Sequence, residues 1–130
     1  MRKKNYHLED LFKALADRTR LRLINMIGDS EVCVCFFVAI LKTSQPKISR
    51  HLAYLRRARI VAARREGKWM HYRLTEPPDE HATHIFREVR ASLAEHPEFQ
   101  RDCEKLLQVC CATQLPVKLR RAPKPAALAA

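Results

Sequence analysis

The sequence predicts a mainly α-helical domain with one β-hairpin. Apolar residues recur at helical spacing in six stretches of the chain, whereas β-compatible runs on either side of a glycine occur once, between residues 60 and 74. A chain of 130 residues can bury one hydrophobic core and gives no reason to expect two. We therefore expect a single domain over residues 1–112, built in the order four helices, two strands and two helices.

An apolar stripe indicates each of the first three helices. The first covers residues 7–16. The second begins at Asp17, a residue type that caps helix N-termini, and ends at Gly28, because glycine is frequent directly after a helix. The third covers residues 31–41 and carries two of the five cysteines near its start.

The fourth helix follows a short turn at residues 42–43 and begins at Ser44, which can cap it. Ile48, Leu52 and Leu55 form its apolar inner face. The opposite face carries side chains that can hydrogen-bond to nucleic acid, namely Gln45, Lys47, Ser49, Arg50 and His51, with Ser44 at the start. A short helix, a tight turn and a second helix of this kind form a helix-turn-helix, in which the second helix reads DNA.

Two β-compatible runs, residues 60–65 and 68–74, are joined by Glu66-Gly67, where glycine supplies the positive φ that a two-residue hairpin turn needs. The tip of this hairpin carries three basic residues, Arg64, Arg65 and Lys68. Basic side chains at a projecting tip suit contact with a phosphate backbone. A hairpin that follows a helix-turn-helix is a wing, so the expected fold is a winged helix-turn-helix.

The positive charge is concentrated in the segment that contains these two motifs. The net charge is +11, and the stretch from Lys42 to Arg73 holds ten basic residues and one acidic residue. A block of one sign inside a folded segment is the electrostatic footprint of phosphate contacts. Nucleic acid is therefore the expected partner, and a basic face that serves solubility alone is the alternative.

Two helices are expected after the wing, over residues 79–95 and 98–111. His96-Pro97 separates them. His81, His84 and Glu88 share one face of the first of these helices, which we interpret as solvated. Residues 113–130 are rich in proline, alanine and basic residues and have too little to bury, so we expect them to be a disordered tail.

The chain shows no apolar segment of the kind that directs secretion or crosses a membrane. Its longest apolar run, residues 32–41, is about half of the roughly 20 residues that a membrane-spanning helix needs. We expect a cytoplasmic protein that binds no membrane. Cysteines are normally reduced in that compartment, so their clustering indicates metal or redox chemistry and not a disulfide framework.

Three blocks of the sequence resemble the ArsR/SmtB family of bacterial metal-sensing repressors. They are Leu-Ala-Asp-Arg-Thr-Arg-Leu at residues 15–21, Glu-Val-Cys-Val-Cys at residues 31–35 and Ser-Gln-Pro-Lys-Ile-Ser-Arg-His-Leu at residues 44–52. The similarity runs from about residue 8 to residue 74 and includes the wing. It implies a homodimer, closed by the first helix and the helix after the wing, that represses its own operon from double-stranded operator DNA until an inducer binds.

Within that family, Cys33-Val34-Cys35 resembles the thiolate site of the arsenite and antimonite sensors, and also that of the cadmium and lead sensors. The sequence departs from both patterns. The arsenite type usually has a third cysteine where this chain has Val38, and the cadmium type takes further cysteines from an N-terminal arm, where this chain has none. Because soft thiolates select soft ions, As(III) is the expected inducer, with Sb(III), methylated As(III), cadmium and lead as alternatives.

On a regular helix, sulfur atoms at positions i and i+2 point about 200° apart. We therefore expect an ion held by both Cys33 and Cys35 to deform the first turn of the third helix, and the strain to reach the DNA-reading helix that follows.

Three further cysteines, Cys103, Cys110 and Cys111, lie on the last helix. Cys103 and Cys110 share an apolar stripe with Phe99 and Leu106, which predicts core residues. The alternatives are a second metal site, or a third ligand that completes the site of the first pair from the same or the other subunit.

A redox-sensing repressor that uses the same thiols is a further alternative. A small thiol-redox enzyme is the rival from another class, but the sequence has no strand-to-helix cysteine motif of thioredoxin type and no residue placed to activate a nucleophile. We therefore expect no enzymatic activity.

Overall fold

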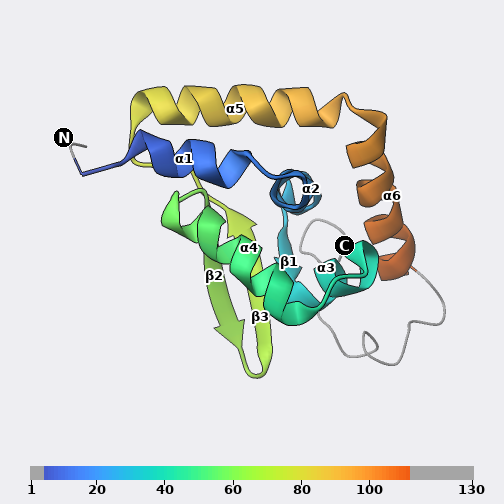
Figure 1. The fold of residues 1–130 in the computed structure, drawn as a ribbon. Helices are drawn as coiled ribbons and strands as arrows, with labels where there is room; N and C mark the ends of the chain where they lie inside the picture. Colours follow the sequence, from blue (N-terminus) through green and yellow to red (C-terminus); the bar gives the residue numbers. More distant parts are fainter. Residues whose placement is uncertain (1–4, 112–130) are drawn as a thin grey trace.

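The computed structural model describes residues 5–111, so the tail expected at residues 113–130 lies outside the described residues. The elements in chain order are α1 (Leu8–Leu15), α2 (Arg18–Ile27), β1 (Glu31–Cys33), α3 (Val34–Leu41), α4 (Gln45–Arg57), β2 (Val61–Glu66), β3 (Trp69–Leu74), α5 (Glu80–Ala94) and α6 (Pro97–Cys111). Helices α3 and α4 form a helix-turn-helix and β2 and β3 form the wing beside it (Figure 1). The predicted mainly α-helical winged helix-turn-helix is confirmed.

The sheet has three strands, not the two that the sequence predicted. Residues 31–33 form β1, which pairs with β3 in the antiparallel order β1-β3-β2. The prediction of a helix over residues 31–41 is therefore wrong for its first three residues. The side chain of Val32 lies opposite Tyr72 and is buried in the core, and the strand pairing satisfies the backbone groups on the open edge of β3. The chain turns into α3 only at Cys33, which is its extended N-cap.

Capping residues begin α2 and α5 and end α2 where the sequence predicted, whereas Ser44 stands at the N-cap of α4 without a side-chain cap hydrogen bond. The Asp17 carboxylate accepts a hydrogen bond of 3.0 Å from the backbone N–H of Arg20, and the Asp79 carboxylate accepts one of 2.9 Å from Ala82. Gly28 ends α2 with a φ of 52°, a left-handed conformation that glycine adopts without strain. These contacts satisfy backbone groups that a helix end leaves unpaired.

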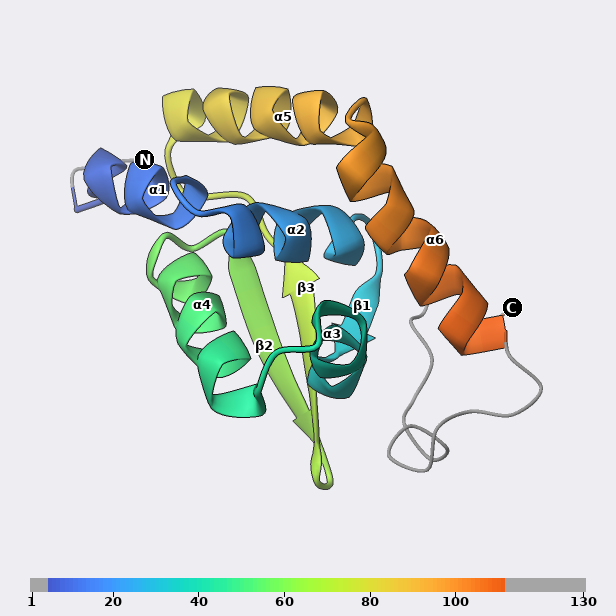
Figure 2. The ribbon, with the colours of Figure 1, turned by 45° about the vertical axis from the view of Figure 1, so that its right-hand side comes forward.

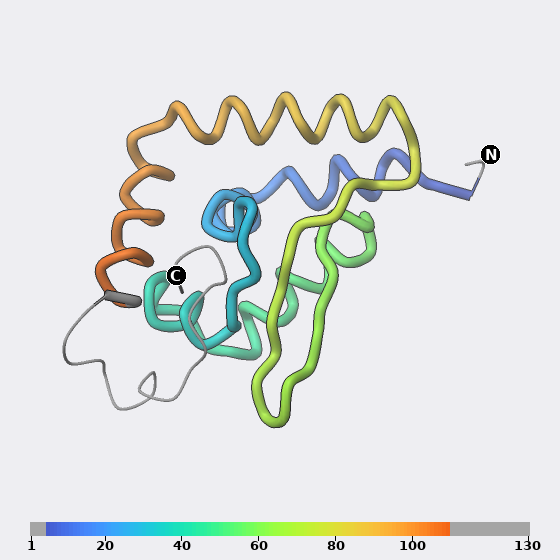
Figure 3. Tube along the Cα trace, turned by 180° about the vertical axis from the view of Figure 1, so that it is seen from behind, coloured from blue at the N-terminus to red at the C-terminus, as the bar shows by residue number. Residues whose placement is uncertain are grey.

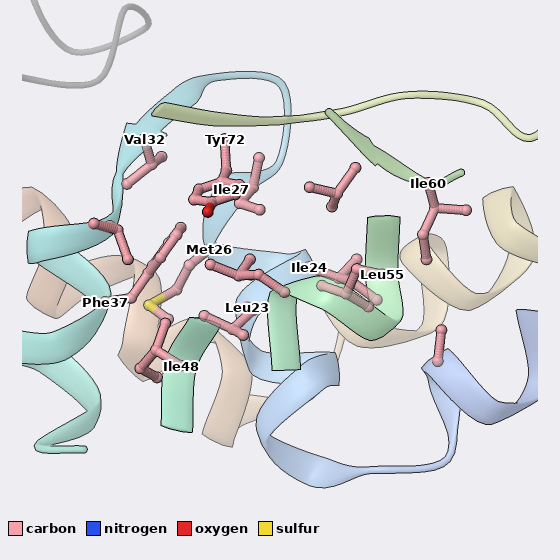
Figure 4. Close-up of a cluster of buried hydrophobic side chains, with 14 of the residues drawn as sticks. Leu23, Ile24, Met26, Ile27, Val32, Phe37, Ile48, Leu55, Ile60 and Tyr72 are labelled. Carbon is pink, nitrogen blue, oxygen red and sulfur yellow. The ribbon is translucent and has the colours of Figure 1, made fainter. Parts of the chain in front are cut away.

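The hydrophobic core lies between the helices and the inner face of the sheet. Figure 4 shows buried side chains from α2, α3, α4 and the strands meeting there, including Ile24, Phe37, Leu55 and Tyr72. Ile48, Leu52 and Leu55 are fully buried, which confirms the predicted inner face of α4. The packing leaves the opposite face of α4 toward solvent.

The turn of the wing lies one residue later than predicted. Glu66 pairs with Trp69, so the two turn residues are Gly67 and Lys68. Gly67 has a φ of 61°, at the first turn position, where a type II′ turn requires glycine. Figure 2 shows the turn projecting on the same side of the molecule as the N-terminal end of α4.

Helix α6 descends from the end of α5 past α2 and toward α3, as the view from behind shows (Figure 3). Arg22 of α2 donates hydrogen bonds of 2.8 and 2.9 Å to the two carboxylate oxygens of Asp102 on α6. Arg18 and Glu98 form a second, exposed ion pair between the same helices. The sequence reasoning missed this attachment.

Within residues 5–111, the helices are all too short or too polar to span a lipid bilayer.

Replacement of Asp102 by alanine should lower the free energy of unfolding by about 2–3 kcal/mol. The Asp102 side chain is 3% exposed, and its removal leaves Arg22 without its bidentate partner. Arg22 is itself 29% exposed and keeps part of its hydration, so the loss should lie at or below the low end of the roughly 3–5 kcal/mol that breaking a buried ion pair costs. Urea unfolding measures this change in the free energy of unfolding. Glu98→Ala is the matched control and should change stability little, because its ion pair with Arg18 is exposed to solvent. Equal losses in the two variants would contradict the conclusion that the buried Asp102 pair stabilises the attachment of α6.

Candidate DNA interface and thiol site

The outer face of α4 carries most of the residues that the sequence assigned to DNA. Ser44, Gln45, Lys47, Ser49 and Arg50 are all exposed. His51 differs, because it is half-buried and its Nδ1 lies 3.3 Å from Nη1 of Arg20 and 3.6 Å from Oδ2 of Asp17. The structure thus leaves the N-terminal part of α4 open and holds its middle against the start of α2.

Arg20 is a residue of this interface that the sequence reasoning missed. Its guanidinium donates hydrogen bonds to the backbone carbonyls of Lys13 and Ala14 at the end of α1. It also lies 4.3 Å from the centre of the Tyr54 ring on α4, within the range of a cation–π contact. Arg20 therefore connects α1 and α2 to α4. The sequence offered one signal that could have identified Arg20. It lies beside the Asp17 cap, inside a block that resembles the ArsR/SmtB family.

The three basic residues predicted at the wing tip have different surroundings. Arg65 and Lys68 are exposed, and Nζ of Lys68 lies 5.1 Å from the centre of the Trp69 ring. Arg64 is held by Glu31 of β1, with an Nη2 to Oε1 distance of 2.6 Å. The Arg64 guanidinium lowers the pKa of the Glu31 carboxyl below its ordinary value, which keeps this group ionised.

The two thiols of Cys33 and Cys35 converge. Their Sγ atoms lie 3.0 Å apart. Cys33 is fully buried at the end of β1, and Cys35 is half-buried in the first turn of α3. Because Cys33 is extended, with φ −71° and ψ 141°, the helical geometry that would point the sulfurs apart does not apply. The expectation that a shared ion must first deform a helical turn is therefore wrong, and both sulfurs already face one point.

The pair is arranged to hold one proton between two sulfurs. Cys35 donates its S–H to Cys33, and this hydrogen bond lowers the pKa of Cys33 to about 6 against the opposing effect of burial. His71, which lies opposite Cys33 in the β1–β3 register, adds a smaller electrostatic contribution in the same direction. The same hydrogen bond, with burial, raises the pKa of Cys35. A thiolate beside a thiol is a soft donor set suited to a thiophilic ion.

Cys103 is not brought into this pair. Cys103 lies against α2, where its Sγ accepts a hydrogen bond of 3.3 Å from Nδ2 of Asn25. The side chains of Cys110 and Cys111 lie outside the described residues. Among the side chains that the structure does describe, no three His, Cys, Asp or Glu groups are close enough together to hold a metal ion. His81, His84 and Glu88 are exposed on α5, in agreement with the solvated face expected for them.

Comparison with known proteins agrees with this architecture. Residues 17–63 match the family profile described as bacterial regulatory protein, arsR family. The solved structure of the AntR antimony-specific transcriptional repressor superposes with a TM-score of 0.52 at 30% identity, covering 70% of this chain and 78% of that one. The chain belongs to the ArsR family.

Two further relatives bear on function. The arsenical resistance operon repressor of Escherichia coli (strain K12) is 52% identical over 66 residues, which are 50% of this chain and 56% of that protein. The homodimeric winged helix-turn-helix DNA-binding domain Mb0332 of Mycobacterium bovis, a possible ArsR-family regulator, has a TM-score of 0.55 at 27% identity and covers 69% of this chain and 81% of its own. This ArsR-family chain spans about half the length of the curated relatives it matches. These relatives are named as regulators and not as enzymes, as the sequence led us to expect.

The ultraviolet absorbance of thiolates should show one step as the pH rises through about 6, the pKa of Cys33. Cys33→Ala should remove this step. Cys35→Ala should move it to higher pH, because the thiolate of Cys33 loses its hydrogen-bond donor. Cys103→Ser is the matched control and should leave the step in place, since burial raises the pKa of Cys103. A step that Cys35→Ala leaves unmoved would show that Cys35 is not the donor.

Proposed function

We propose that the protein is a homodimeric transcriptional repressor that binds operator DNA through α4 and the wing and is released when Cys33 and Cys35 capture As(III). The observation that carries the proposal is the convergence of the two sulfur atoms, 3.0 Å apart, at the junction of β1 and α3. This junction adjoins both DNA-binding elements, because α3 leads into α4 and β1 pairs with the wing strand β3.

Duplex DNA is the partner that suits the basic surface. The exposed N-terminal part of α4 supplies Gln45, Lys47, Ser49 and Arg50, side chains that hydrogen-bond to base edges and phosphates in a major groove. The wing projects on the same side (Figure 2) and adds basic residues suited to the flanking backbone. An operator with two half-sites would match a dimer.

The dimer would form through α1 and α5. Leu8 and Phe12 of α1 are large apolar side chains that this chain leaves exposed. Ile85 and Val89 of α5 are only partly buried against the core. Apolar residues left in solvent on neighbouring helices indicate an interaction surface. The structural relative Mb0332 is named as homodimeric, which supports a dimer.

Capture of arsenous acid by the thiol pair balances as an exchange of ligands. One thiolate and one thiol form two As–S bonds, two As–OH bonds break, and one water and one hydroxide leave. The soft ion favours sulfur over oxygen. The names of the arsenical resistance repressor and of the antimony-specific repressor support As(III) and Sb(III) as ligands. Methylated As(III), cadmium and lead remain alternatives, and Cys103, Cys110 and Cys111 remain candidates for a third ligand or a second site.

A redox-sensing repressor is the second candidate function, and the same distance favours it. Two thiols at 3.0 Å, one of them biased toward the thiolate, are also placed to form a disulfide when a peroxide accepts their electrons. Release by arsenite under reducing conditions distinguishes ligand capture from oxidation.

Lys47→Ala and Arg50→Ala should each weaken operator binding by about 1–3 kcal/mol without unfolding the chain, because both side chains are exposed on α4. His51→Ala should also weaken it, partly by releasing the contact with Arg20. Fluorescence anisotropy with operator duplex at moderate salt measures the change. Lys105→Ala, which removes an equal charge from the exposed face of α6, is the control. Operator binding at full strength in all three variants would show that α4 does not read the DNA.

Cys33→Ser and Cys35→Ser should each bind operator as the parent does and resist release by arsenite, because a hydroxyl is a far poorer ligand for a soft ion than a thiolate. Replacement of Cys103, Cys110 and Cys111 together by serine should have a smaller effect, since the first pair of sulfurs remains. Titration of the protein–DNA complex with arsenite under reducing conditions tests both sets. Normal release of the Cys33/Cys35 double variant, combined with failure of the triple variant, would move the sensing site to α6.

A further inference from the structure

The outer face of the sheet places a carboxylate of β1 against a basic residue of the wing. Side chains alternate across a strand, and Val32 and Tyr72 are buried on the core side. Glu31, Cys33 and Arg64 therefore share the other face. Arg64 of β2 reaches over the central strand β3 to Glu31 of β1, so this ion pair connects the two outer strands of the sheet.

The contact occupies two of the nitrogen donors of Arg64. Nε lies 3.1 and 3.2 Å from the two carboxylate oxygens of Glu31, and Nη2 lies 2.6 Å from Oε1. The Arg64 side chain is nevertheless 51% exposed, whereas that of Glu31 is 21% exposed. A guanidinium at the surface can exchange its partner readily, because exposed ion pairs contribute little to stability.

We propose that Glu31 limits the DNA affinity of the wing by holding the guanidinium that would otherwise contact a DNA phosphate. The inference rests on the proposed function, because it assumes that the wing lies along duplex DNA. Glu31 is then an affinity-determining residue of the interface, although it touches no nucleic acid. The carboxylate competes with phosphate for the same fork of donors, and where it stays near Arg64 in the complex it also repels the phosphate.

Glu31 restrains one of the three basic residues of the wing tip and leaves the other two unrestrained. Arg65 and Lys68 are free of any carboxylate contact among the interactions described for residues 5–111, so they supply phosphate contacts that Glu31 does not weaken. The wing would therefore bind DNA with one of its three tip cations restrained by the strand that carries Cys33.

Glu31→Gln tests the proposal, because glutamine keeps the shape of the side chain and removes its charge. We expect binding to operator and to a random duplex to become about two- to fivefold tighter, since exposed ion pairs contribute only weakly. The salt dependence of binding should steepen by up to about one counterion, as for one added phosphate contact. Glu76→Gln is the matched control. It removes the same charge from an exposed ion pair with Arg87 outside the wing and should change affinity little.

The double variant Glu31→Gln/Arg64→Ala distinguishes a direct competition from a general change of charge. If Glu31 acts through Arg64, the gain from Glu31→Gln disappears when Arg64 is replaced by alanine. Glu31→Ala should reproduce the gain, and circular dichroism should show every variant folded.

Three outcomes overturn the inference. Affinity unchanged in Glu31→Gln, with the parent binding duplex, refutes it and leaves the proposed function intact. An equal gain from Glu31→Gln with and without the Arg64→Ala substitution refutes it in favour of a general charge effect. A parent protein that binds neither duplex at low salt refutes the proposed function, and this inference with it.

Discussion

The antiparallel pairing of β1 with β3 is the constraint on which the candidate site depends. Because Val32 faces Tyr72 in the core, Glu31 and Cys33 must lie on the opposite face of the sheet. The strand also ends at Cys33 in an extended conformation, and the chain enters α3 at the next residue, which brings the Cys35 thiol back toward Cys33. A slip of one residue in this register would exchange the two faces of β1.

Helix α2 packs against most of the other elements of the fold. It contacts α1, α4, α5, α6 and β3. Its Arg22 holds α6 through the buried Asp102, and Asn25 donates to Cys103, the next residue along α6. Cys103 is thus part of the attachment between α2 and α6. Cys103 is half-buried at this contact and is not one of the fully buried core residues, and a role as third ligand within the same subunit would require α6 to leave the partners that hold it.

The sequence predicted those features that depend on local pattern. The caps at Asp17 and Asp79 and the buried face of α4 follow from residue type and spacing, because a helix end and an amphipathic face are determined within a few residues. The strand at residues 31–33 could not be found in this way. Three residues carry no usable periodicity, and their structure is determined by β3, which is distant in the sequence. The ion pairs of Arg22 and Arg64 are also contacts between distant segments, which one sequence without a fold does not reveal.

The convergence of the two thiols implies a different mechanism of induction from the one expected if both cysteines lay on a regular helix. If the sulfurs had pointed apart on a helix, the ion itself would have had to supply the energy of a local unwinding. In this structure they already face one point, so under the proposed function capture would replace an S–H···S hydrogen bond by two As–S bonds without unwinding α3. For capture to release DNA, the ion must bind the released form more tightly than the DNA-bound form. Because α3 leads into α4 and β1 pairs with the wing strand β3, any change in the sulfur–sulfur geometry that the two As–S bonds impose would act on both proposed DNA contacts. A differential binding energy of about 1–3 kcal/mol would be sufficient for release, because it changes operator affinity by about 5- to 150-fold.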